Sequence, residues 1–254
     1  MKLVKTSNKL RTSSMLLCAA MLSLGLVACE PRSVTVAADE TQAVVDISPR
    51  ERIEGVHVLM HHGLAMVAEG ADLVMVSHLG VEPNMDDEGT QHGRAIVASG
   101  RDLIEEALVV NQSLAEVANQ PLVDFTSELG ESYLAVTDVL DNMEAPDMNS
   151  EAAALHHMHM MLNHALRMAA DGANLRMLGT RERDVAVAQL GGRHGEQMLD
   201  NANEMVEQVL TGPSMDNAHT LGLVGDPMRT THMLADSVKA VIDLMEQMPA
   251  TPSS

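Results

Sequence analysis

The chain has 254 residues and is strongly acidic, with 36 Asp and Glu against 16 Lys and Arg. An acidic surface repels nucleic acid and anionic membranes, and Phe125 and Tyr133 are the only Phe, Tyr or Trp residues available to stack on bases. These two features exclude nucleic-acid binding. The chain is instead rich in methionine and histidine, with 21 Met and 12 His.

The first 28 residues have the pattern of a signal peptide. Four basic residues precede an apolar run at 15–27, which is too short to span a bilayer permanently. The run ends in Leu26-Val27-Ala28-Cys29, which resembles the lipobox of bacterial lipoproteins. In that family the cysteine is lipidated and becomes the new N-terminus. The resemblance implies a signal peptide at 1–28, followed at 29–47 by a lipidated Cys29 and a tether.

The same resemblance implies a location in the cell envelope. Glu30 follows the cysteine, and in such lipoproteins the absence of Asp there favours passage to the outer membrane, facing the periplasm or the cell exterior. Cys18 would leave with the signal peptide and Cys29 would carry lipid. Any metal site in the mature chain therefore has to use His, Met, Asp or Glu.

Helical spacing of apolar residues continues through the rest of the chain. Ser48 and Pro49 predict a helix start, because serine caps helices and proline suits the first helical position. The elements expected in the first half are a helix at 49–77, an acidic loop at 78–91, a helix at 91–118 closed by Pro121, and a helix at 127–143.

The second half follows the same plan. Its expected elements are a helix at 150–178, a helix ending near Leu210 with Gly191-Gly192 as a break or irregular start, and a last helix from Asp226-Pro227 to Pro249. No segment predicts a strand, so we expect an all-α protein.

An internal repeat underlies this similarity. Residues 55–110 return without gaps at 157–212, and Gly70 and Gly93 return as Gly172 and Gly195. We therefore expect a helical bundle built from two tandem homologous three-helix repeats, at 48–145 and 149–248, packed around a pseudo-two-fold axis.

Four of the repeated residues are histidines that helical angles place within apolar stripes. They are His57 and His92 in the first copy, and His159 and His194 in the second. We expect all four to face the core, where they would bind a metal or haem or hydrogen-bond a neighbouring polar group. A haem would be non-covalent haem b, because the chain has no Cys-x-x-Cys-His sequence.

A second set of histidines and methionines faces away from the core. His62 and Met66 lie one helical turn apart, and His164 and Met168 repeat them. His157 and Met161 extend the second pair backwards along the helix. Imidazole together with thioether suits copper, and thioether favours Cu(I). The alternatives are that this face packs against another surface or that the residues have no function.

These patterns lead to three hypotheses, none of them enzymatic, because no nucleophile motif or phosphate-binding glycine loop is present. The first is a lipid-anchored envelope protein that binds a transition metal ion, most simply copper, for storage, buffering or delivery. The second is a haem-binding or electron-transfer bundle that uses the core histidines. The third is a metal-independent interaction or scaffold lipoprotein in which the histidines serve as polar, hydrogen-bonding groups between helices. The sequence does not specify an oligomeric state.

Overall fold

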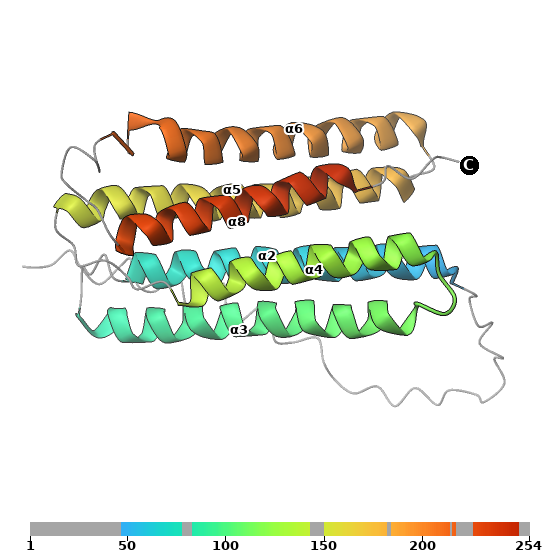
Figure 1. The fold of residues 1–254 in the computed structure, drawn as a ribbon, viewed down its shortest axis with the longest axis horizontal. Helices are drawn as coiled ribbons and strands as arrows, with labels where there is room; N and C mark the ends of the chain where they lie inside the picture. Colours follow the sequence, from blue (N-terminus) through green and yellow to red (C-terminus); the bar gives the residue numbers. More distant parts are fainter. Residues whose placement is uncertain are drawn as a thin grey trace, which may run out of the picture. The chain divides into compact units, whose positions relative to one another are not determined.

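A computed structural model describes residues 47–77, 83–142, 150–181, 184–213, 215–216 and 226–248. The expected signal peptide, Cys29 and the tether up to residue 46 lie outside this part of the chain. The described part consists of helices and short connections and contains no strand (Figure 1); its long helices are α2 (Pro49–Ser77), α3 (Pro83–Ser113), α4 (Gln120–Asp141), α5 (Ser150–Arg181), α6 (Val185–Thr211) and α8 (Asp226–Gln247). The all-α prediction is confirmed.

The helices form one bundle with two layers. Helix α2 packs along α3, α5 packs along α6, and α2 contacts α5, so that α3, α2, α5 and α6 make a row (Figure 1). Helices α4 and α8 contact each other, and each also packs on two helices of the row. A single cluster of buried hydrophobic residues runs through both halves.

The start of α2 has the predicted cap. The backbone N–H of Ser48 donates to the Glu51 carboxylate at 2.8 Å, and the backbone N–H of Glu51 donates to Ser48 Oγ at 3.2 Å. This reciprocal pair is a capping box, which satisfies donors that the first helical turn leaves open. The predicted end at Ser77 is also observed.

Three boundaries in the first half differ from the prediction: α3 begins at 83 instead of 91 and ends at 113 instead of 118, and α4 begins at 120 instead of 127. Residues 83–91 belong to α3 and are not a loop. Proline suits the first helical position, and the acidic residues 86–88 lie near the positive end of the helix dipole, so the composition that indicated a loop also stabilises a helix start. Pro121 likewise lies in the first turn of α4 instead of closing α3.

In the second half, α6 continues through Gly191 and Gly192 without a break. A Cβ added at Gly179 of α5 would be 2.8 Å from Ala188 O of α6, and one added at Gly191 would be 3.3 Å from Leu175 O of α5, whereas nothing lies within 4 Å of a Cβ at Gly192. Gly179 and Gly191 therefore allow a close approach of the two helices, and this packing offsets the low helix propensity of glycine.

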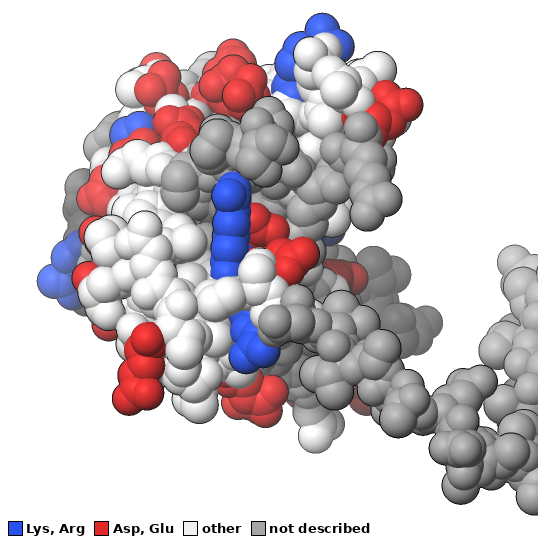
Figure 2. Space-filling model, turned by 90° about the vertical axis from the view of Figure 1, so that its right-hand side faces the viewer, with Lys and Arg blue, Asp and Glu red and all other residues white. Residues whose placement is uncertain are grey.

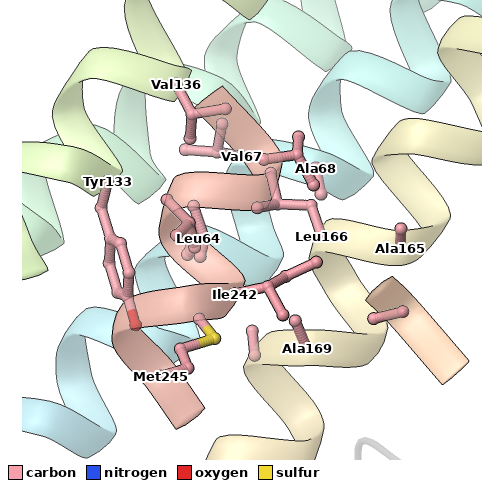
Figure 3. Packing of buried hydrophobic residues seen from close by; sticks show 14 of the residues in the cluster. Leu64, Val67, Ala68, Tyr133, Val136, Ala165, Leu166, Ala169, Ile242 and Met245 are labelled. Atoms are coloured by element: carbon pink, nitrogen blue, oxygen red, sulfur yellow. The ribbon is translucent and has the colours of Figure 1, made fainter. Parts of the chain in front are cut away.

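The centre of the core is aliphatic. Leu64 of α2, Val136 of α4, Leu166 of α5 and Ile242 of α8 meet there (Figure 3), and all four are fully buried. Methionine contributes Met60, Met158 and Met245, each with no exposed surface. Because methionine is flexible and fills irregular gaps, these residues have a packing role that needs no ligand.

The repeated glycines lie where paired helices approach each other closely. A Cβ added at Gly70 would be 2.6 Å from Gly93 O, and one added at Gly172 would be 2.8 Å from Gly195 O. Such distances are below any real Cβ contact, so each pair of helices meets backbone to backbone. The glycines in the repeat therefore limit the spacing of α2 from α3 and of α5 from α6, and between α2 and α3 a second pair, Gly63 with Gly100, does the same.

Candidate histidine and methionine sites

His57 and His159 are buried as predicted, and each is bonded to a threonine. His57 Nε2 lies 2.7 Å from Thr126 Oγ1, and His159 Nε2 lies 2.9 Å from Thr231 Oγ1. Thr126 Oγ1 donates its own hydrogen to Leu122 O at 2.7 Å. Its oxygen therefore accepts from His57, which assigns the Nε2–H tautomer to this neutral imidazole.

A third buried histidine, His61, was not singled out in the sequence. Its Nδ1 lies 3.0 Å from Asn174 Oδ1, so Nδ1 carries the hydrogen and Nε2 is left as an acceptor. His61 Nε2 and Tyr133 Oη have no hydrogen-bond partner among the described residues, and their rings lie 5.8 Å apart between centroids. The second copy has Asn163 in place of His61, so a comparison of identical residues passes over this position. The signal that could have identified this position is that both copies have a polar residue there, His61 and Asn163, at the edge of an apolar stripe.

A second hydrogen bond joins the same two helices. Asn163 Nδ2 of α5 donates to Asp72 Oδ1 of α2 at 3.1 Å. Together with the bond from His61 to Asn174, it fixes how α2 and α5 lie along each other. Burial raises the pKa of the Asp72 carboxyl, and its hydrogen bond with Asn163 and the charges of Arg167 and His164 partly offset that effect.

Burial also keeps the three inner imidazoles uncharged. It lowers the pKa of His57 and of His159 to about 4. For His61 it lowers the pKa to about 3, with a further contribution from neighbouring His57 and a smaller opposing effect of the bond with Asn174. At neutral pH these residues act as neutral hydrogen-bonding groups inside the bundle.

The prediction that His92 and His194 face the core is wrong, because both are exposed. Helix α3 turns a face with Gly93, Val97 and Ile104 toward α2, and these residues are buried, whereas Ile96 and Leu103, which helical spacing places in one apolar stripe with His92, are only partly buried. The glycines permit the closest approach and so decide which face is covered. The same rotation exposes His194 in α6.

Haem binding depended on these positions. The haem hypothesis used His57, His92, His159 and His194 as core ligands, but His92 and His194 lie at the surface. Nε2 of His57 and of His159 is engaged with a threonine. The residues present therefore do not fit a haem held between two core histidines.

The outward His/Met set consists of His62, Met66, His157, Met161, His164 and Met168. Its histidines are exposed and its methionines are partly buried. Met161 and Met168 pack against the hydrophobic cluster, so packing accounts for part of their presence. His164 lies close enough to Asp72 to lower the pKa of the Asp72 carboxyl. The set thus presents imidazole to solvent, with thioethers one turn away along α2 and α5.

No three His, Cys, Asp or Glu side chains gather into a group that could hold a metal ion in the described ranges. Methionine sulfur is a further kind of ligand, and the outward His/Met set combines it with imidazole. None of the described helices has the length and apolar character needed to cross a membrane.

The comparisons with known proteins found no match. No family model matches the chain, and neither the curated proteins nor the solved structures contain a match. The class of the protein that the fold defines is therefore a helical bundle, with threonine-bonded histidines inside and exposed histidines one turn from partly buried methionines on α2 and on α5.

Proposed function

We propose that this protein is a lipid-anchored envelope protein that binds a transition metal, copper in preference to others, for storage, buffering or delivery. The observation that carries the proposal is the recurrence of an exposed imidazole one turn from a thioether in both α2 and α5 (His62 with Met66, His164 with Met168). Thioether sulfur adds affinity for Cu(I), whereas zinc and nickel would use the imidazoles alone.

Copper titration of the untagged protein tests this proposal. We expect replacing His62 and His164 by Gln, and Met66 and Met168 by Leu, to weaken Cu(I) binding at least tenfold against a competing chelator. The control replaces His232 and Met233 of α8 in the same way. Both are exposed but adjacent in sequence, so they cannot present one pair on one face. Equal Cu(I) affinity in the two variants would contradict the proposal.

A metal-independent interaction or scaffold role is the second candidate. The threonine bonds of His57 and His159 favour it, because they give the inner histidines a structural task. This candidate predicts the same thermal unfolding temperature with copper, with a chelator and without either. A copper-dependent rise that the His62, Met66, His164 and Met168 variant lacks would exclude it.

We also infer that residues 48–145 and 149–248 are diverged copies related by a two-fold axis between α2 and α5. A shift of 102 positions carries residues 61 and 72 onto 163 and 174. The bond between His61 and Asn174 and the bond between Asp72 and Asn163 are therefore exchanged by this relation, which supports it. An experimental structure in which α2, α3 and α4 failed to superpose on α5, α6 and α8 would contradict it.

A further inference from the structure

An open cleft lies at the end of the bundle where α2 begins and α3 gives way to α4. Its volume is about 650 Å³, within the roughly 300–1,000 Å³ typical of small-molecule sites. Its apolar walls come from three segments of the chain and consist of Ile53, Val117, Ala118, Pro121, Leu122 and Phe125. We call it the Phe125 cleft.

The apolar walls of the Phe125 cleft are partly exposed to solvent. Ile53 is fully buried, while 60% of Val117 is exposed, so the cleft runs from the core to the surface. In Figure 2 this end of the bundle faces the viewer, with a wide uncharged area and with acidic and basic side chains around it. An aliphatic ligand would gain by removing this apolar surface from water.

A basic group stands at the mouth of the cleft. Arg50 lines it beside Ser48 and Pro49, in a chain where acidic residues far outnumber basic ones. Its Nε donates to Glu54 at 3.3 Å, and 46% of its side chain is exposed. A guanidinium has five N–H donors, so the bond with Glu54 leaves others that can meet an anion.

We propose that the Phe125 cleft binds a single-chain anionic amphiphile, such as a fatty acid, with the aliphatic chain along the apolar walls and the carboxylate at Arg50. This binding is separate from the metal proposal, because the cleft shares no residue with the outward His/Met set. Phe125 packs against the hydrophobic cluster and lies edge-on to His57, but it is only partly buried, so part of its surface remains open to the cleft.

The composition of the chain provides a direct test. Phe125 is the only phenylalanine, so biosynthetic labelling with 4-fluorophenylalanine gives a protein with one ¹⁹F resonance, located in the cleft. We expect dodecanoate, titrated below its micelle concentration, to shift this resonance in a saturable way that fits one site. Dodecanol, which lacks the charge, should bind roughly two- to fivefold more weakly, the size expected of an exposed ion pair.

Variants separate the cleft from general adsorption. Val117→Glu places a negative charge in the cleft and should weaken dodecanoate binding at least fivefold. Val109→Glu is the matched control, because Val109 is 66% exposed on α3 and does not line the cleft. Arg50→Gln should remove the preference for dodecanoate over dodecanol, whereas Arg193→Gln, at an exposed position of α6, should leave it unchanged.

Three results would overturn the proposal. One is a resonance that does not respond to dodecanoate, or that responds equally in the Val117→Glu and Val109→Glu proteins. Another is equal binding of dodecanol and dodecanoate with no effect of Arg50→Gln. The third is a shift produced by phosphatidylglycerol vesicles and not by dodecanoate, which would make the cleft a membrane contact. Circular dichroism of each variant confirms that it is folded.

Discussion

A buried imidazole destabilises the fold when its ring nitrogens lack partners, and Thr126 supplies a partner for His57. The threonine accepts from His57 and donates to Leu122 O, so a single hydroxyl satisfies groups of two helices. Thr231 occupies the corresponding place beside His159. These two contacts connect the first helix of each half to the third.

Thr126→Val should therefore destabilise the bundle by about 1–3 kcal/mol, because it leaves His57 Nε2–H buried without an acceptor. Thr137→Val is the matched control. Thr137 is also fully buried and donates to a carbonyl of its own helix, Tyr133 O, but it has no histidine partner. Urea unfolding followed by circular dichroism measures both. A loss for Thr126→Val no larger than that for Thr137→Val would show that the histidine contact contributes nothing.

At the scale of elements, glycine decides how the helices pair. Gly70 and Gly93 bring α2 against α3, and Gly172 and Gly195 bring α5 against α6. Each contact involves main-chain atoms, which cannot move aside as a flexible side chain can. The crossing is consequently intolerant of even one added carbon.

Gly70→Ala should destabilise the protein by about 1–3 kcal/mol, because its Cβ would be 2.6 Å from Gly93 O and 2.8 Å from Val97 N. Gly55→Ala, also within α2, is the control. Nothing lies within 4 Å of its added Cβ, so we expect a gain of about 0.5–1 kcal/mol from helix propensity. The free energy of unfolding in urea distinguishes the two. A Gly70→Ala protein as stable as the Gly55→Ala protein would contradict the close crossing.

For the whole molecule, three buried neutral histidines make stability depend on pH. The pKa is about 4 for His57 and His159 and about 3 for His61 in the folded protein, against 6.5 for an ordinary histidine. Between these values the unfolded chain binds more protons than the folded one. The contribution is therefore fully present above pH 6.5 and is lost as the pH falls toward 4.

We expect each of the three histidines to cost about 2 kcal/mol of stability at pH 5 relative to pH 7.5. His61→Asn, which introduces the residue found at position 163, should reduce the pH dependence by one such contribution. His62→Asn, at an exposed position, should leave it unchanged. Urea unfolding at pH 7.5, 6 and 5 provides the measurement. Equal pH dependence in the two variants would refute a neutral buried His61.

Several features of this fold could be predicted from the amino-acid sequence, because they depend on residues that are close together in the chain. The helix start capped by Ser48 and the apolar spacing of α2 depend on residues within a few turns, and both were predicted correctly. The burial of His57 and His159 followed from the same spacing. The start of α3 was missed because proline and acidic residues are typical of loops and of helix starts alike.

Tertiary packing decided the remaining features. Helical spacing defines a stripe on α3, but the close backbone contact of Gly93 with Gly70 rotated that stripe and left His92 exposed. The bonds of His61 with Asn174 and of Asn163 with Asp72 join residues far apart in the chain. The spacing of apolar residues along one helix indicates only which face of that helix is apolar. The burial of a residue and its pairing depend on which neighbouring helix packs there and on how near the backbone of that helix can approach.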